Sequence, residues 1–315
     1  MKRRNFIQKS SLLSMAMATG SAWSMGSEIP GQRKFRLSLN PYAIGVDINQ
    51  EEMIDKALEF NFEAILPVPG QLMDMSPGKL NEFLAKKEAH QLTWDAAGLP
   101  VDFRKDKAIF EQGLKELPKA AATLRKCGVS RVSTWIMPTH DELSYLENFK
   151  QHSERLGKAA QILGEEGLKL GFEYVGTKNL KIRSRYPFVG TMKEMLELIA
   201  DIDRPNVGIQ LDSFHWYTSN ETPADLEKLS NDQIVTCDLN DATAGRSLAE
   251  QIDGERQLPG DSGLIDLKGF MQALVNIGYD GPVRAEPFNA KLNALDNDKA
   301  LAATSKAMWR TINLI

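Results

Sequence analysis

Short apolar runs alternate with longer amphipathic stretches along most of the chain. The short runs are bounded by Gly, Pro and polar residues and predict buried strands, whereas apolar residues at helical spacing predict helices. The expected strands are residues 35–40, 64–68, 92–98, 131–137, 169–175, 207–214, 233–239 and 282–287. The expected helices are residues 51–60, 79–90, 107–126, 141–166, 192–202, 224–229, 267–277 and 299–312.

Two of these helices carry local signals. Pro118 predicts an interruption in the helix at 107–126, because proline lacks an amide donor and clashes with the preceding turn. The helix at 141–166 is expected to start from Thr139 as its cap, with Glu142 three residues further on.

Eight strands that alternate with helices predict a single (β/α)8 TIM barrel over residues 30–315 of the 315-residue chain. The alternative is a doubly wound open sheet. That fold would place a Gly-rich nucleotide fingerprint after the first strand, and the sequence has none there. We therefore expect one α/β domain.

Residues 1–26 differ in kind from the rest, with a basic start, a weakly apolar middle and small residues near the end. This build predicts a secretory signal peptide. Arg3, Arg4, Phe6 and Lys9 resemble the twin-arginine export signal, which carries folded proteins across the bacterial inner membrane, with cleavage at or shortly after Ala22. The alternative is a disordered basic tail. The sequence thus predicts a periplasmic protein.

Charge and cysteine content exclude several partners. The formal charge is -4, and removal of the four basic leader residues would make it more negative, which argues against nucleic acid. The leader is too short and too polar to be a stable membrane anchor. Cys127 and Cys237 fit neither a disulfide framework nor a CxxC metal site, so both are expected to be buried thiols.

Four successive predicted strands each end with one carboxylate. These are Glu173, Asp212, Asp238 and Glu286, and His215 follows Asp212 in DSFH. The C-terminal ends of barrel strands converge on one mouth, so these side chains are expected to meet. Because isolated carboxylates are costly to bury, a cluster of four requires protons, arginines or a cation, and a divalent metal is the simplest choice.

The pattern resembles the xylose isomerase-like barrel superfamily, in its sugar phosphate isomerase and epimerase branch. That family carries a metal-binding Glu on strand five, Asp-x-x-His on strand six, a His on strand seven and a Glu on strand eight. Glu173, Asp212 with His215, and Glu286 match this pattern. The stretch LPGDSGLIDLKGFMQALVNIGYDGPVRAEPF also resembles the family's approach to strand eight.

One position departs from the family. Asp238 stands where the family has its strand-seven His. If Asp238 is a ligand, four carboxylates face one divalent ion, and an all-oxygen set favours Mn²⁺ or Mg²⁺, with Ca²⁺ or Zn²⁺ as alternatives. Alternatively, Asp238 stays outside the shell and water replaces the missing ligand.

The resemblance implies proton abstraction next to a sugar carbonyl that a metal polarises. Glu173 and Glu286 would then be the catalytic acid/base pair and also metal ligands, together with Asp212 and Asp238.

Substrate-binding candidates lie beside these acids. His215 is expected to hydrogen-bond a substrate oxygen, and Arg256 to hold a hydroxyl or to offset the negative charge, although a solvated loop arginine is equally consistent. Trp94, Trp135 and Trp216 lie at or near strand ends, where rings either stack on sugar C–H faces or fill the core.

These features predict a metal-dependent isomerase or epimerase for a small-molecule carbohydrate. Export favours free sugars or glycosides over sugar phosphates. The close alternative is a lyase or hydratase that cleaves a keto-glycoside with the same residues, and a third is a sugar-binding barrel without catalysis. A zinc endonuclease of the same superfamily is excluded, because the four histidines are too few and badly placed for its histidine-rich cluster. Family analogy suggests a homo-oligomer.

Overall fold

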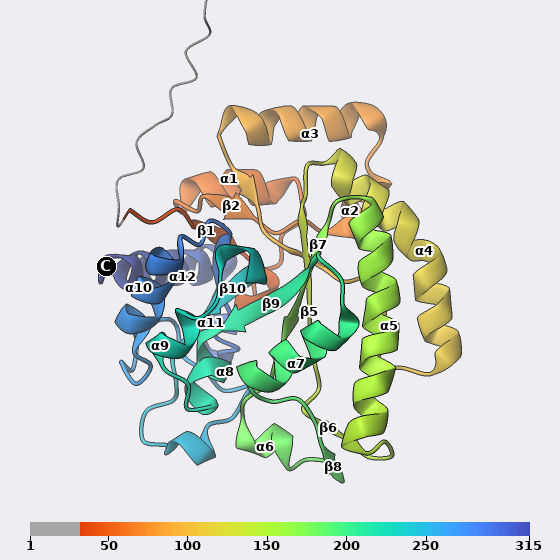
Figure 1. The fold of residues 1–315 in the computed structure, drawn as a ribbon. Helices are drawn as coiled ribbons and strands as arrows, with labels where there is room; N and C mark the ends of the chain where they lie inside the picture. Colours follow the sequence, from red (N-terminus) through yellow and green to blue (C-terminus); the bar gives the residue numbers. More distant parts are fainter. Residues whose placement is uncertain (1–31) are drawn as a thin grey trace, which may run out of the picture. The chain divides into compact units, whose positions relative to one another are not determined.

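Nine strands form one parallel sheet that closes into a barrel (Figure 1). Their order is β3-β2-β1-β11-β10-β9-β7-β5-β4. Only two residues separate β3 from β4, so the two ends of this order are halves of one interrupted strand. The eight predicted strands are thereby confirmed. The strands are β1 (Arg36–Leu39), β2 (Ala64–Ile65), β3 (Thr93–Trp94), β4 (Ala97–Gly98), β5 (Arg131–Trp135), β7 (Lys169–Glu173), β9 (Val207–Asp212), β10 (Ile234–Leu239) and β11 (Pro282–Ala285).

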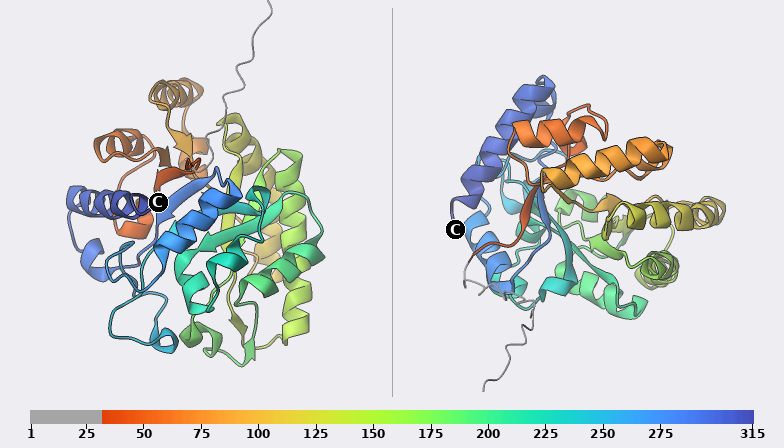
Figure 2. Two further views of the ribbon diagram at one scale, coloured as in Figure 1. Left: turned by 60° about the vertical axis from the view of Figure 1, so that its left-hand side comes forward. Right: turned by 90° about the horizontal axis from the view of Figure 1, so that it is seen from above.

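Helices surround this barrel, as the view from above shows (Figure 2). The structure is a computed structural model that describes residues 32–315, so the expected signal peptide lies outside the described residues. The helices are α1 (Glu52–Glu59), α2 (Pro69–Asp74), α3 (Pro77–Ala89), α4 (Lys107–Lys126), α5 (Tyr145–Glu165), α6 (Lys178–Lys181), α7 (Met192–Ile202), α8 (Ser213–Thr218), α9 (Pro223–Leu226), α10 (Leu267–Ile277), α11 (Ala290–Asn293) and α12 (Asn297–Ile312).

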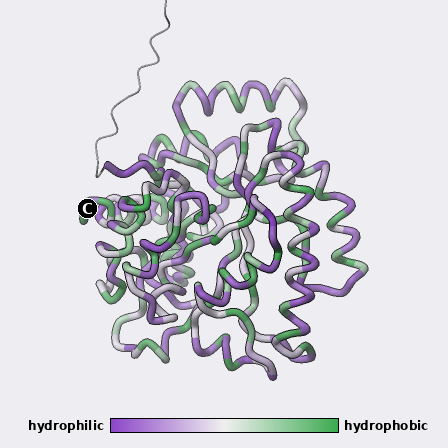
Figure 3. Tube along the Cα trace, in the orientation of Figure 1, coloured by the Kyte–Doolittle hydropathy of each residue, from purple (hydrophilic) through white to green (hydrophobic). Residues whose placement is uncertain are grey.

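The long outer helices alternate between hydrophilic and hydrophobic positions (Figure 3). In α5 the buried face includes Leu156, Ala159, Ala160 and Leu163, at the spacing of one helix stripe. Burial of this stripe against the strands stabilises the helix, because short isolated helices are marginal in water. Among the described residues, no helix is both long and apolar enough to span a bilayer.

Two expectations about helix ends and breaks were wrong. The long helix after β5 begins at Tyr145, where Ser144 and Glu147 form a reciprocal capping box. Thr139 is instead part of β6 (Thr139–His140), which pairs antiparallel with β8 (Tyr186–Pro187). Pro118 lies inside α4, which runs through it without a break.

Strand six is two residues shorter than predicted. β9 ends at Asp212, and the next residues form α8. The Oδ1 atom of Asp212 accepts the amide N–H of Phe214 at 2.6 Å and of His215 at 3.4 Å, so the carboxylate caps the helix. The cap turns His215 back toward the end of the strand that carries Asp212.

The inside of the barrel is polar rather than aliphatic. Asp95 accepts hydrogen bonds from Ser38 Oγ at 2.7 Å and Thr236 Oγ1 at 3.2 Å, and pairs with Arg284 Nη1 at 3.4 Å. Arg284 also pairs with Asp238. The apolar core lies outside this network, between strands and helices, where residues such as Leu37 and Leu39 are fully buried.

Candidate active site

The four predicted carboxylates lie at the C-terminal ends of neighbouring strands. Glu173 and Asp212 are the last residues of β7 and β9, Asp238 lies in β10, and Glu286 follows β11. One oxygen from each of Glu173, Asp238 and Glu286 lies within 4.8 Å of the others. The same holds for one ligand atom from each of Glu173, Asp212 and His215. Glu173, Glu286 and His215 line one cavity of about 330 Å³.

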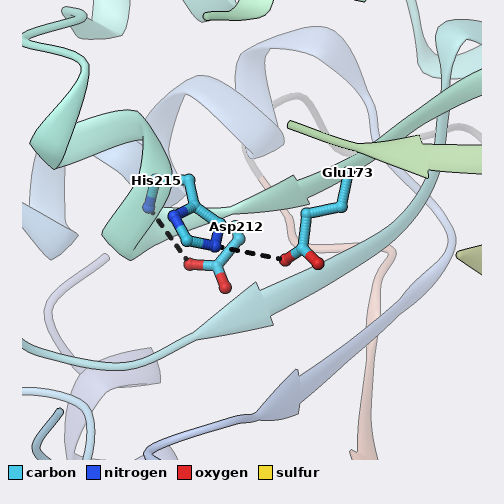
Figure 4. A group of neighbouring side chains, drawn as sticks. All are labelled: Glu173, Asp212 and His215. Atoms are coloured by element: carbon cyan, nitrogen blue, oxygen red, sulfur yellow. Dashed lines mark hydrogen bonds and ion pairs between the residues drawn. The ribbon is translucent and has the colours of Figure 1, made fainter. Parts of the chain in front are cut away.

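The imidazole of His215 faces Glu173, while its backbone amide faces Asp212, as Figure 4 shows. Its Nδ1 accepts the amide N–H of Gly176 at 3.2 Å. Its Nε2 lies 3.2 Å from Arg256 Nη2, 3.4 Å from Asp253 Oδ1 and 3.9 Å from Glu173 Oε1. Burial lowers the pKa of His215 to about 4, so the ring is neutral at pH 7.

Arg256 is buried and holds three acids at once. Its Nη1 atom lies 2.7 Å from Asp212 Oδ2 and 3.2 Å from Glu286 Oε2, and its Nη2 donates to Asp253 Oδ1 at 2.7 Å. The planar fork of guanidinium suits such multiple recognition of carboxylates. Arg256 is therefore part of the acidic cluster and not a solvated loop residue.

Asp238 is held inside the barrel by neighbouring polar side chains. Arg284 Nε donates to Oδ1 at 2.5 Å, while Arg284 Nη2 and Gln210 Nε2 donate to Oδ2 at 3.2 Å and 2.9 Å. Three donors therefore already occupy the two oxygens of Asp238. Little of its lone-pair capacity remains for another ligand.

Burial and mutual repulsion separate the acids into two kinds. Burial, and then the charges of Glu286, Asp212 and Asp238, raises the pKa of Glu173 well above its ordinary value. Burial and the charge of Asp238 raise the pKa of Glu286 to about 8. Burial would also raise the pKa of Asp212, but Arg256 and His215 lower it to about 2. Two carboxyl groups can thus hold protons beside one that stays ionised.

The residues present fit a divalent cation. Glu173 Oε1 is buried and has no hydrogen-bond partner, which is the state expected of a ligand atom. Arg256 pairs with Asp212, Asp253 and Glu286, and Arg284 pairs with Asp95 and Asp238. Together with Glu173 these are six carboxylates, and if all of them were ionised they would exceed the two arginines by four negative charges. Glu173 belongs to both groups of ligand atoms that could hold such an ion, with Asp238 and Glu286 in one and with Asp212 and His215 in the other.

Of the three predicted tryptophans, the structure brings only Trp135 to this cavity. Trp94 lies in a separate cavity beside the first residues of β1, β5 and β11, and its Nε1 donates to the Cys127 carbonyl at 2.8 Å. Trp216 is buried in α8 and packs edge-on against Phe270, with ring centroids 5.2 Å apart. Cys127 and Cys237 are buried free thiols, as expected.

Several residues of the site were missed in the sequence. Arg284 lies two residues before Glu286, and the two-residue period of strands would have placed both on the inner face. Asp253, Asn240 and Phe288 lie in loops, where periodicity gives no direction. Asn240 Nδ2 donates to Asp212 Oδ1 at 3.1 Å, and Phe288 lines the cavity.

Comparison with known proteins supports this architecture. A family profile described as "Xylose isomerase-like TIM barrel" matches residues 54–312, which is most of the chain. The chain belongs to the xylose isomerase-like TIM barrel family. A solved family structure, a xylose isomerase domain protein from Alicyclobacillus acidocaldarius, superposes with a TM-score of 0.79 at 27% identity, covering 89% of this chain and 99% of that one.

Characterised relatives in the family catalyse more than one reaction. An inosose isomerase of Bacillus velezensis is 25% identical over 244 residues, covering 76% of this chain and 83% of that protein. A 3-dehydroshikimate dehydratase of Pseudomonas putida is 28% identical over 127 residues, covering 40% of this chain and 19% of that protein. A structure of the IolI protein with a bound zinc atom shares the fold, with a TM-score of 0.73 at 21% identity and coverage of 89% of this chain and 98% of that one.

Proposed function

We propose that this protein is a sugar isomerase or epimerase that moves a proton on the carbon next to a carbonyl. The observation that carries the proposal is the placement of Glu173 and Glu286 on one cavity, with carboxylate oxygens within 4.8 Å of each other. Two carboxyl groups so close can both reach a single substrate carbon. Because their pKa values are raised, one can act as acid while the other acts as base.

A divalent cation, when bound, would polarise the substrate carbonyl and lower the barrier to loss of the neighbouring proton. Glu173 would hold it, either with Asp238 and Glu286 or with Asp212 and His215, and the predominance of carboxylate oxygens favours Mn²⁺ or Mg²⁺. The IolI structure, which shares this fold, contains a bound zinc atom.

The remaining side chains orient the sugar. The Nε2 atom of His215 lies 3.9 Å from Glu173 Oε1 and can hydrogen-bond a substrate oxygen beside the reacting carbon. Arg256 fixes Asp212, Asp253 and Glu286 in one arrangement, so the base does not reorganise during proton transfer. Trp135 and Phe288 line the same cavity as the acids and give the sugar an apolar surface.

The test is proton exchange in heavy water. Purified enzyme supplied with Mn²⁺ or Mg²⁺ is incubated with free ketoses, aldoses and 3-keto-glucosides, and deuterium uptake is followed by NMR. We expect deuterium in an intact or isomerised sugar, and loss of this signal in Glu173→Gln and Glu286→Gln. Glu221→Gln is the matched control, because Glu221 is paired with Tyr174 outside the cavity.

Elimination is a second candidate, favoured by the similarity to a 3-dehydroshikimate dehydratase. After the base removes the carbon-bound proton, the electron pair forms a C=C bond as a neighbouring C–O bond breaks, and the departing oxygen takes a proton from the second carboxyl group. Release of an alcohol or aglycone with an unsaturated or hydrated keto-sugar would establish this outcome. Binding without exchange or release would instead support a sugar-binding barrel.

We also propose export to the periplasm through the twin-arginine-like leader, which favours free sugars or glycosides as substrates. Fractionation of a tagged full-length protein, compared with an Arg3→Lys, Arg4→Lys variant, tests this. Retention of both forms in the cytoplasm would contradict it.

A further inference from the structure

The cavity over the acids has two chemically different walls. Glu173, Glu286, His215, Asp253 and Arg256 form a polar wall. Besides Arg183, the other lining residues are apolar; they are Trp135, Met137, Val175, Leu180 and Phe288. A free sugar can meet the polar residues with its hydroxyls and stack a C–H face on one aromatic ring, so a second fixed ring in the same cavity offers a surface for a further ring of the substrate.

Trp135 is exposed yet fixed in place. It ends β5, is 39% exposed, and lines the cavity. The Arg104 guanidinium stacks over its ring, 4.2 Å from the centroid, and donates to Thr134 Oγ1 at 3.0 Å and to the Trp135 carbonyl. Cation–π stacking and these hydrogen bonds hold the indole before any ligand arrives.

Phe288 is held in the same way, in the loop after β11. It is 37% exposed, and the Arg256 guanidinium stacks over its ring, 4.7 Å from the centroid. Its backbone has φ 39°, in the left-handed region that is strained for a residue with a side chain. Asn289 fixes the turn by donating to the Arg256 carbonyl at 2.9 Å. The fold thus keeps a large ring at the cavity despite both exposure and backbone strain.

We propose that Trp135 and Phe288 form a subsite for a second ring joined to the reacting sugar, so that the substrate is a glycoside. This inference rests on the proposed function, because it assumes that the reacting sugar occupies the polar wall. Two fixed aromatic surfaces suit the C–H face of a pyranose or the face of an aryl aglycone. A pyranose and an aryl aglycone would each present an apolar face to these two rings.

Binding to the inactive Glu286→Gln variant tests the subsite without turnover. The ligands are 3-keto-glucose, phenyl 3-keto-glucoside in both anomers, and 3-keto-cellobiose, measured by calorimetry and by tryptophan fluorescence. We expect both ring-bearing classes, or one of them, to bind at least about 10-fold tighter than the monosaccharide. Tighter binding of the phenyl glucosides would identify the second ring as an aryl group, and tighter binding of 3-keto-cellobiose would identify it as a sugar.

Adding Trp135→Ala or Phe288→Ala to this variant should weaken the ring-bearing ligand about 10-fold and the monosaccharide less than about 3-fold. Phe288→Gly removes the ring while relieving the strained backbone, so it separates ring loss from misfolding. Trp94→Phe is the control, since Trp94 lies in the other cavity. The subsite is wrong if all ligands bind Glu286→Gln with equal affinity. It is also wrong if Trp135→Ala and Phe288→Ala weaken the binding of all ligands equally.

Failure of the subsite and failure of the proposed function give different results. If wild-type enzyme exchanges deuterium into 3-keto-glucose while ring-bearing ligands bind no more tightly than the monosaccharide, the subsite is wrong and the proposed function stands. If ring-bearing ligands bind tightly through Trp135 and Phe288 while no sugar exchanges deuterium, the subsite stands and the function is wrong.

Discussion

Arg256 Nη1 lies 2.7 Å from Asp212 Oδ2, and both side chains are almost fully buried. The same guanidinium pairs with Asp253 and Glu286, which come from a loop and from the end of β11. One cation therefore joins three parts of the chain that are distant in sequence. This arrangement determines both the stability of the site and the direction in which Glu286 faces.

Removal of Arg256 should be costly. We expect Arg256→Met to lower the free energy of unfolding by about 3–5 kcal/mol, because buried carboxylates lose their partner. Arg256→Met combined with Asp212→Asn should cost less than the sum of the two single changes, because the second change removes an unpaired charge. Urea unfolding measures all four proteins, and strict additivity would contradict the proposed coupling.

Metal binding distinguishes Glu173 from Asp238. Titration of Mn²⁺ into Glu173→Gln should show at least about 10-fold weaker binding, because the orphaned ligand oxygen is lost. Asp238→Asn should change affinity less, since Arg284 and Gln210 already occupy that carboxylate. Titration calorimetry measures the binding of Mn²⁺ directly and does not depend on catalytic activity. A larger loss in Asp238→Asn would mean that Asp238 is a ligand after all.

The sequence pattern predicts the strand-end acids of the site, but it does not predict the contacts that depend on loops and on side-chain direction. Apolar runs ending in an acid correctly placed Glu173 and Asp212 at strand ends, because strand period and barrel topology fix where such residues lie. The ion pairs of Arg256 depend on the path of a long loop, which no periodicity encodes. Trp94 shows the same limit, since a strand-end position did not determine to which cavity its ring would turn.

Stability should fall in mild acid because of His152, which packs between Phe103 and Phe188. Burial lowers the pKa of His152 from 6.5 to about 4. Between these values the unfolded chain binds the proton more readily, so the contribution is complete above about pH 6.5 and is lost as pH falls toward 4. The loss can reach about 3 kcal/mol.

Unfolding experiments at several pH values check this expectation. His152→Gln should show a shallower fall in stability between pH 6.5 and 4 than the wild type. His90→Gln, at an exposed position, should leave the slope unchanged. An unchanged slope in His152→Gln would show that other groups cause the acid sensitivity.

Gly176 is required by its closeness to His215. A Cβ at this position would lie 2.5 Å from the His215 carbonyl and 2.5 Å from Ser219 Oγ. Gly176→Ala should therefore displace α8, lower the stability by about 1–3 kcal/mol and reduce activity. Gly78→Ala, where nothing lies within 4 Å in helix α3, should be neutral or stabilising. Equal stability and activity in both variants would contradict this packing.

The most direct measurement is deuterium exchange at the carbon next to a carbonyl, by wild type, Glu173→Gln and Glu286→Gln under identical metal loading. The expected result is exchange by the wild type and a loss of at least about 10²-fold in each variant, with folding and ligand binding retained. Exchange that persists in both variants, or that is absent from the wild type while sugar is bound, would contradict the role of this glutamate pair.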